Sequence, residues 1–260
     1  MKTKYYKSKS MRQKYLVYQH LSNVYTLQPL LPDTTLFSKR NLLKMVREYP
    51  KLYIKPNKGA QGHGIYKLTR KQSRSEKRTY LRLKSLKKTK TFREIKPLYR
   101  YLNKKKRRKM IIQQGITLEK VKGRPYDLRV MVQRKPRGSW TCTGMFSKVG
   151  KKGNIVTNFA QGGRIVLLNQ LFKKLKLSPS EKDKRRAELS QSAVEISRVL
   201  NSKRPGMHEM GIDFAYDHHG HLWLLEVNSS SPQFYPLKKI DRKMYKRMMR
   251  FARSYGRRHA

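Results

Sequence analysis

Gly211 to Asn228 is the segment that most constrains what this chain can fold into. Apolar and polar residues alternate along it on both sides of His218-His219, which is the pattern of a β-hairpin closed by a two-residue turn. One face of such a hairpin is apolar and is expected to lie against a hydrophobic core. That face carries Ile212, Phe214, Tyr216, Trp223, Leu225 and Val227. The segment therefore predicts an antiparallel sheet with one buried face.

The other face of the hairpin gathers oxygen atoms at one end. The two-residue turn places Asp213 opposite Leu224, and Glu226 and Asn228 follow on the same face. Two carboxylates and an amide carbonyl suit Mg²⁺, which takes few protein oxygens and adds waters and nucleotide phosphates. The alternative is that each carboxylate pairs with a nearby arginine. We favour the metal, because the chain places two of only 15 Asp and Glu residues here.

A strand, a glycine-rich loop and a second strand form a hairpin-like flap at residues 55–68. The first strand, Leu52 to Pro56, carries Lys55 near its end, where the ammonium can reach a phosphate. Glycine leaves the loop backbone uncovered, so its N–H groups can approach the same oxygens. The spacing of a Walker loop is absent.

Further candidate phosphate ligands follow along the chain. Arg129 comes two residues after Asp127 on a predicted strand, so both side chains lie on one face. Asn158 and Arg164 flank the pair Gly162-Gly163. Each of these residues alone has an ordinary structural explanation, because lysines and arginines are abundant and glycines form turns. Only their order along the chain points to one site.

The charge of the chain is its most unusual bulk property. Sixty-four Lys and Arg residues against 15 Asp and Glu give a formal charge of +49 in 260 residues. Such a charge predicts salt-dependent attraction to polyanions, which include nucleic acids, acidic proteins, anionic polymers and membrane surfaces. The single cysteine, Cys142, excludes an intrachain disulfide. No apolar run is as long as a membrane span, and we expect a cytoplasmic protein.

Helices and surface segments complete the sequence-based prediction. Residues 1–13 form a polar, basic tail, and residues 70–109 form a very basic surface insertion. Four helices are predicted from apolar spacing and capping residues. The first covers Lys14 to Asn23, and the second runs through Leu42 and Val46 after a cap at Thr34, Thr35 or Ser38. The third begins at Ser178-Pro179, with Glu181 completing its capping box. The fourth is a basic helix from Arg242 to Tyr255.

The ordered set of motifs resembles the ATP-grasp superfamily, and within it the YheC/YheD-like branch associated with bacterial spore coats. The resemblance extends over almost the whole chain, from about Lys14 to Tyr255. It implies an α+β fold in which two lobes with antiparallel-rich sheets clasp a nucleotide under the flap. The lobes would comprise residues 14–118 and 119–260. Few residues precede Lys14, so we expect no acceptor domain ahead of the module.

The resemblance also implies roles for individual residues. Those that would contact ATP are Lys14, Lys55, the flap residues Gly59, Gln61, Gly62 and Gly64, the hinge residues Gln113, Gln114, Gly115 and Ile116, Glu119 at the ribose, and Asn158. Arg129 and Arg164 would serve catalysis, with Arg129 stabilising the transferring phosphoryl group. Asp213, Glu226 and Asn228 would hold one or two Mg²⁺ ions. Gln114 stands where many relatives have an acidic residue.

Three functions are compatible with these features. The first is a ligase-like enzyme that activates a carboxylate as an acyl-phosphate and joins it to an amine or thiol, with an acidic acceptor. The second is a non-catalytic ATP-binding protein that associates with a spore layer through charge. The third is non-specific nucleic-acid binding, for which the charge of +49 suffices.

Overall fold

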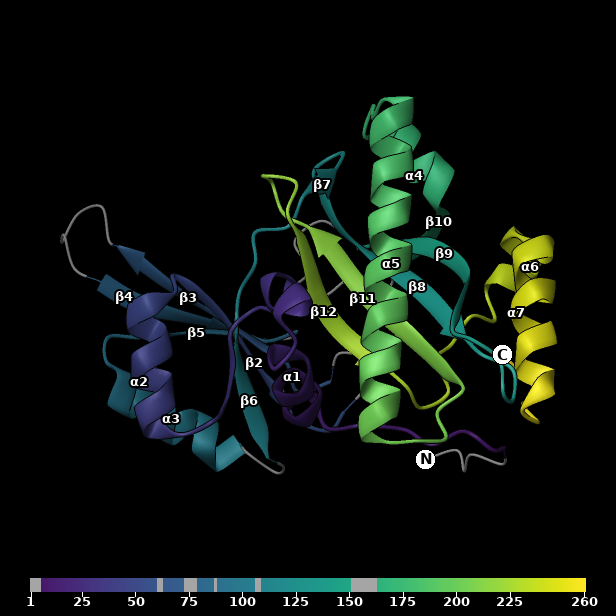
Figure 1. The fold of residues 1–260 in the computed structure, drawn as a ribbon. Coiled ribbons are helices and arrows are strands. Elements are labelled where there is room, and N and C mark those ends of the chain that lie inside the picture. Colours follow the sequence, from purple (N-terminus) through teal and green to yellow (C-terminus); the bar gives the residue numbers. More distant parts are fainter. Residues whose placement is uncertain (1–5, 60–62, 73–78, 87, 106–108, 151–162) are drawn as a thin grey trace.

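The chain forms two lobes, each built on one antiparallel sheet, in the computed structural model (Figure 1). The lobes lie side by side, with one helix, α1 (Lys14–Ser22), beside their junction. The structure describes residues 6–59, 63–72, 79–86, 88–105, 109–150 and 163–260. The ATP-grasp expectation of an α+β fold with antiparallel sheets is confirmed at this level.

The N-terminal lobe has a sheet with the strand order β1-β6-β2-β3-β4-β5. Its strands are β1 (Thr34–Leu36), β2 (Lys51–Pro56), β3 (Tyr66–Gln72), β4 (Thr79–Lys84), β5 (Thr89–Phe92) and β6 (Met110–Gln114). Helices α2 (Lys39–Glu48) and α3 (Ile95–Lys105) pack on one face and share a buried apolar core with it. Ser38 caps α2 as expected, since its side chain accepts from the Asn41 N–H.

The basic stretch 70–109 differs from the expected surface insertion, because it completes the N-terminal lobe. It supplies β4, β5 and α3. Leu81 and Leu83 on β4 and Leu98 and Leu102 on α3 are at most 5% exposed. These apolar residues alternate with the lysines and arginines, so the charges lie outside while the leucines enter the core.

The C-terminal lobe has a sheet with the strand order β10-β9-β8-β11-β12, and β7 pairs with β8. Its strands are β7 (Lys120–Val121), β8 (Arg124–Gln133), β9 (Thr141–Val149), β10 (Arg164–Leu167), β11 (Glu209–Tyr216) and β12 (Leu222–Asn228). Helices α4 (Leu168–Lys174) and α5 (Pro179–Lys203) pack on one face, and α6 (Leu237–Ile240) and α7 (Arg242–Ser254) on the other. The predicted capping box of Ser178 and Glu181 opens α5.

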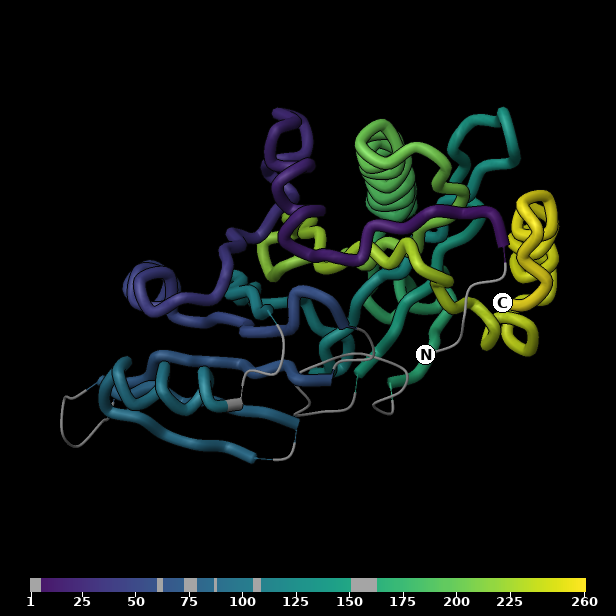
Figure 2. Tube along the Cα trace, turned by 90° about the horizontal axis from the view of Figure 1, so that it is seen from below, coloured from purple at the N-terminus to yellow at the C-terminus, as the bar shows by residue number. Residues whose placement is uncertain are grey.

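Residues 6–13, which precede α1 in the predicted basic tail, are held against the C-terminal lobe. Met11 is 5% exposed, and its backbone N–H and carbonyl both bond the Ser229 hydroxyl, at 2.9 and 3.0 Å. The Lys9 N–H donates to the Gly206 carbonyl at 2.8 Å. Figure 2 shows this segment running along the C-terminal lobe towards α7. The short helix η1 (Tyr25–Leu30) follows α1.

The pairing of β11 with β12 corrects the predicted hairpin register. The turn has three residues rather than two, because the Asp217 N–H donates to the His221 carbonyl. A β-bulge then takes up Leu225, so Asp213 lies opposite Glu226 and not opposite Leu224. Leu224 pairs with Phe214 and is 5% exposed in the core, whereas it was expected on the polar face.

Trp223 also leaves the core face on which it was predicted. It pairs with Ala215, and its indole N–H donates to Asp217 Oδ2 at 2.9 Å. The bulge compensates for the longer turn by pairing Asp213 with Glu226, so Asp213, Glu226 and Asn228 share one face.

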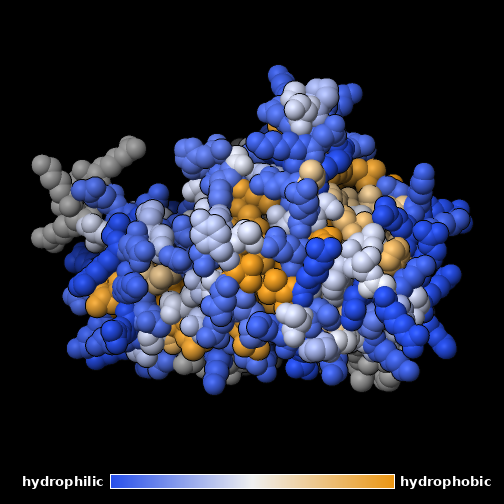
Figure 3. Space-filling view, in the orientation of Figure 1, coloured by the Kyte–Doolittle hydropathy of each residue, from blue (hydrophilic) through white to orange (hydrophobic). Residues whose placement is uncertain are grey.

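The face of the molecule seen in Figure 3 is mainly hydrophilic, with small apolar areas near its middle. Among the described residues, no helix is both long enough and apolar enough to cross a bilayer.

Candidate functional site

Asp213 is the centre of a buried charge cluster on the C-terminal sheet. The β8–β11–β12 register places Arg129, Asp213 and Glu226 side by side on neighbouring strands. Arg129 holds Asp213 with two nitrogens, Nε to Oδ1 at 2.6 Å and Nη2 to Oδ2 at 2.8 Å. Lys148 on β9 adds a third contact, Nζ to Oδ1 at 3.0 Å. The Asp213 side chain is 7% exposed.

The cluster keeps Asp213 ionised. Burial raises the pKa of this carboxyl, but the charges of Arg129 and Lys148 and their hydrogen bonds outweigh burial and lower it to about 2. Lys148 also pairs with Asp127 Oδ1 at 2.9 Å. Sequence reasoning did not identify Lys148, although a lysine inside a largely uncharged central strand is a usable signal.

Glu226 faces the N-terminal part of the chain through Lys14. The Lys14 ammonium lies 2.9 Å from Glu226 Oε1 and donates to the Gly59 carbonyl at 3.0 Å. The start of α1 is fixed to the same loop, because Asn57 accepts from the Lys14 N–H at 2.9 Å. A single lysine therefore joins the loop after β2 to the proposed metal-binding strand.

Lys55 reaches across from β2 to the second sheet. Its ammonium lies 3.5 Å from the carbonyl oxygen of Leu225, the bulged residue of β12. Burial lowers the pKa of Lys55 to about 8; Glu226 acts in the opposite direction, while Lys14 lowers it further. Lys55 of the N-terminal sheet and Glu226 of the C-terminal sheet thus lie at the same junction.

A cleft of about 40 Å³ lies at this junction. Four of the predicted site residues line it: Lys14, Lys55, Gln113 and Glu226. Leu224 and Leu225 supply an apolar wall. An apolar wall beside a few converging polar groups is typical of small-molecule sites.

The predicted hinge residues lie in and just after β6. Gln113 donates from Nε2 to Thr34 Oγ1 at 2.9 Å, and the Gln114 side chain accepts from the Asp33 N–H at 3.1 Å. A Cβ at Gly115 would lie 2.8 Å from the backbone oxygen of Lys51, so only glycine fits. Ile116 follows directly and is partly buried.

Some predicted residues do not join this cluster. Glu119 is paired with Arg185, Oε2 to Nη1 at 2.8 Å. Arg164 pairs with Val149 on the sheet face opposite to Lys148, and its side chain is exposed. Gly64 has a φ of +71°, which suits glycine. Gln61, Gly62 and Asn158 lie outside the described residues.

The residues predicted to bind a metal offer few donors, and Asp213 among them is already engaged by Arg129 and Lys148. Within the described ranges, no group of three His, Cys, Asp or Glu side chains is arranged to hold a metal. The donor set is therefore two carboxylates and the Asn228 amide, whose Nδ2 lies 3.2 Å from Asp213 Oδ2. Glu226 is the accessible member, with 27% of its side chain exposed. This set fits Mg²⁺ when nucleotide phosphates and waters complete its coordination.

Gly211 makes room for the Arg129 side chain, because any larger residue would clash with its neighbours. A Cβ there would lie 2.7 Å from Pro232 Cβ and 2.8 Å from Arg129 Nη1. Because Asp213 holds this guanidinium, we expect Gly211→Ala to lower the free energy of unfolding by about 1–3 kcal/mol in urea titrations. Gly138→Ala is the matched control, since its nearest neighbour would be 3.4 Å away. Equal stability of the two variants contradicts the tight packing described here.

Known proteins are similar to this chain over most of its length. The family model of YheC/D-like ATP-grasp proteins matches residues 2–255. The chain belongs to this family. It is 31% identical to the endospore coat-associated protein YheD of Bacillus subtilis over 230 residues, 85% of this chain and 49% of YheD. The corresponding protein YheC is 22% identical over 221 residues, 83% of this chain and 59% of YheC. The chain thus spans about half of these relatives.

The ATP-grasp fold is also found among solved structures. N5-carboxyaminoimidazole ribonucleotide synthetase from Thermotoga maritima aligns with a TM-score of 0.52 at 12% identity, covering 96% of this chain and 50% of the synthetase. At this identity the likeness concerns the fold.

Proposed function

We propose that this ATP-grasp protein binds ATP with Mg²⁺ in the cleft between its lobes. The observation that carries the proposal is the convergence of Lys14 and Lys55 with Glu226 on one cleft, with Asp213 and Arg129 directly behind. Lysines neutralise phosphate charge, while carboxylates hold the metal that bridges phosphates. The Lys14 ammonium against Glu226 marks a position that attracts a cation.

The protein residues would promote phosphoryl transfer by position and charge. Asp213 engages Nε and Nη2 of Arg129, so the guanidinium plane is fixed. A fixed guanidinium stabilises the negative charge of a transferring phosphoryl group without reorganising during the reaction. Glu226, Asp213 and Asn228 would hold Mg²⁺, which neutralises phosphate charge when bound.

We further propose ligase-like activity on an acidic acceptor. A second depression, of about 550 Å³, adjoins Glu226 and Asn228 and is lined by basic groups. They are Arg12, Lys14, Lys58, Lys203 and Arg204. A carboxylate drawn there by charge would lie beside the proposed metal site, where ATP could activate it as an acyl-phosphate.

Thermal unfolding and ADP release test the two proposals separately. Ligand that binds only the folded protein raises its stability, by about 2.7 kcal/mol at a concentration 100 times its Kd. We expect ATP to raise the melting temperature only when Mg²⁺ is present. We expect ADP release when a panel of carboxylates and amines contains the acceptor. No shift at millimolar Mg·ATP contradicts the binding proposal, whereas a shift without ADP release from any acceptor contradicts turnover.

A nucleotide-binding spore-layer protein is the second candidate. The names of YheD and YheC favour it, because both are endospore coat-associated proteins. The charge of +49 would supply adhesion to an anionic layer. Two results together would support this candidate. ATP would stabilise the protein without turnover, and the protein would move from the cytoplasm to the coat in sporulating cells. Tight DNA binding whose affinity falls steeply with salt concentration and is unchanged by ATP would instead support nucleic-acid binding.

A further inference from the structure

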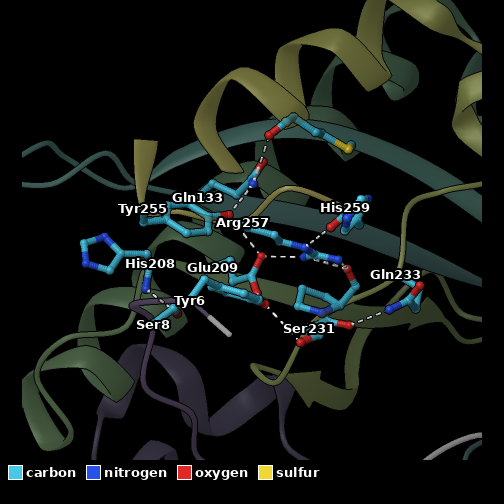
Figure 4. Close-up of polar contacts among 12 residues, drawn as sticks. Tyr6, Ser8, Gln133, His208, Glu209, Ser231, Gln233, Tyr255, Arg257 and His259 are labelled. Atoms are coloured by element: carbon cyan, nitrogen blue, oxygen red, sulfur yellow. Dashed lines mark hydrogen bonds and ion pairs between the residues drawn. The ribbon is translucent and has the colours of Figure 1, made fainter. Parts of the chain in front are cut away.

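Glu209, the first residue of β11, is the centre of a second buried charge cluster (Figure 4). Its side chain is fully buried. Arg257 donates from Nη1 to Glu209 Oε2 at 2.6 Å, and the Tyr255 hydroxyl donates to the same oxygen at 3.0 Å. The Tyr6 hydroxyl donates to Oε1. Burial removes water from both members of an ion pair, so such a cluster adds little net stability to the fold. We therefore ask which part of the backbone it holds in place.

The geometry enforced is that of the loop after β12. Arg257 donates from Nη1 and Nη2 to the Pro232 carbonyl, both at 3.1 Å. Tyr6 is hydrogen-bonded to Ser231 Oγ at 3.0 Å. Ser231 has a φ of +53°, in the left-handed region that costs a residue with a side chain free energy. The cluster therefore holds a strained loop that begins directly after Asn228.

This loop touches the proposed phosphoryl site through Pro232. The buried pyrrolidine ring and the Arg129 guanidinium both lie over Gly211, with Pro232 Cβ 2.7 Å and Arg129 Nη1 2.8 Å from one point above its Cα. They are therefore neighbours. Asp213 holds Nε and Nη2 of Arg129, while the proline flanks the Nη1 side. Movement of the loop would release one side of the guanidinium.

We propose that Arg257 is a positioning residue for Arg129, acting through the Pro232 carbonyl and ring. The consequence for nucleotide rests on the proposed function, but the positioning itself does not. Arg257 touches neither the cleft nor the basic depression. Arg257 thereby fixes the position of the Arg129 guanidinium, and this position determines how closely the guanidinium can contact a terminal phosphate.

Two substitutions interrupt this chain of contacts at different points. Arg257→Lys keeps a positive charge beside Glu209 but cannot make the two-nitrogen contact with the Pro232 carbonyl. Pro232→Ala keeps the carbonyl and removes the ring. Arg258→Lys is the matched control, because Arg258 is the exposed neighbour. Should Arg257→Lys fail to fold, Pro232→Ala still decides the question.

The first readout requires no nucleotide. The Nε–H resonance of Arg129, identified by its loss in Arg129→Lys, is expected to shift in Arg257→Lys and Pro232→Ala but not in Arg258→Lys. The two changes should also be non-additive when combined, because they act on one path. An Arg129 resonance unmoved in both variants overturns the proposal, whether or not the protein binds ATP.

The second readout connects positioning to the phosphate. We expect the affinity ratio of ATP to ADP to fall about tenfold in both variants, because small misplacements of a charged group weaken its contact. ADP affinity alone should be unchanged. If Arg129→Lys lowers the ATP to ADP affinity ratio but Arg257→Lys and Pro232→Ala do not, the proposal is overturned. A ratio that even Arg129→Lys leaves unchanged contradicts the proposed function of Arg129, while the resonance still decides the positioning.

Discussion

Replacing Glu226 with glutamine is expected to abolish Mg·ATP-dependent thermal stabilisation and to lower any turnover by about 100- to 1,000-fold. Glu226 is the accessible carboxylate of the proposed metal site, and an amide binds Mg²⁺ weakly because it carries no charge. The fold should survive, because glutamine has nearly the same size as glutamate and its amide oxygen can still accept from the Lys14 ammonium. Thermal melts with and without Mg·ATP measure the effect.

Asp183→Asn is the matched control, because it removes one carboxylate charge at a side chain that is 81% exposed on α5. It should respond to Mg·ATP like the unaltered protein. If Glu226→Gln retains full stabilisation by Mg·ATP and full turnover, the assignment of Glu226 to the metal is incorrect.

Replacing Asp213 with alanine should produce the largest loss of stability, about 3–5 kcal/mol. The change leaves Arg129 and Lys148 buried without the carboxylate that both of them contact. Urea unfolding measures the difference. Asp213→Asn should lose less, because the amide oxygen can still accept from Arg129.

The stability contributed by Asp213 should also depend on pH. Its pKa is lowered from 3.8 in the unfolded chain to about 2 in the folded protein. The ionised form therefore contributes its stability fully above the unfolded value, and this contribution is lost as the pH falls from about 4 to 2. Subtracting the Asp213→Asn profile from that of the unaltered protein should give this slope. Parallel profiles between pH 4 and 2 contradict the buried pairing.

Local signals along the chain predicted much of the fold. Ser178 and Glu181 opened α5 as expected, because a capping box depends only on residues three apart. The shared face of Asp213, Glu226 and Asn228 also followed from strand alternation. The N-terminal lobe was less well predicted, since leucines such as Leu81 and Leu98 are buried among lysines and arginines that dominate the local composition.

Contacts between distant segments could not be predicted in this way. The pairing of Lys148 with Asp213 depends on strands β9, β8 and β11 lying in that order. Arg257 reaches Glu209 only because α7, which precedes it, packs against β8 and β9. The bulge at Leu225 reflects packing of Leu224 against the core, which hairpin turn rules do not include.

The bulge makes β12 sensitive to changes in length. Leu225 is the extra residue that sets Glu226 beside Asp213 and turns its own carbonyl towards Lys55. One residue inserted between Leu222 and Leu224 would carry Glu226 to the opposite face, whereas the same insertion at residues 218–220 would only enlarge an exposed turn. Relatives that bind nucleotide in the proposed way should therefore vary in length at the hairpin tip and hold the spacing of this strand constant.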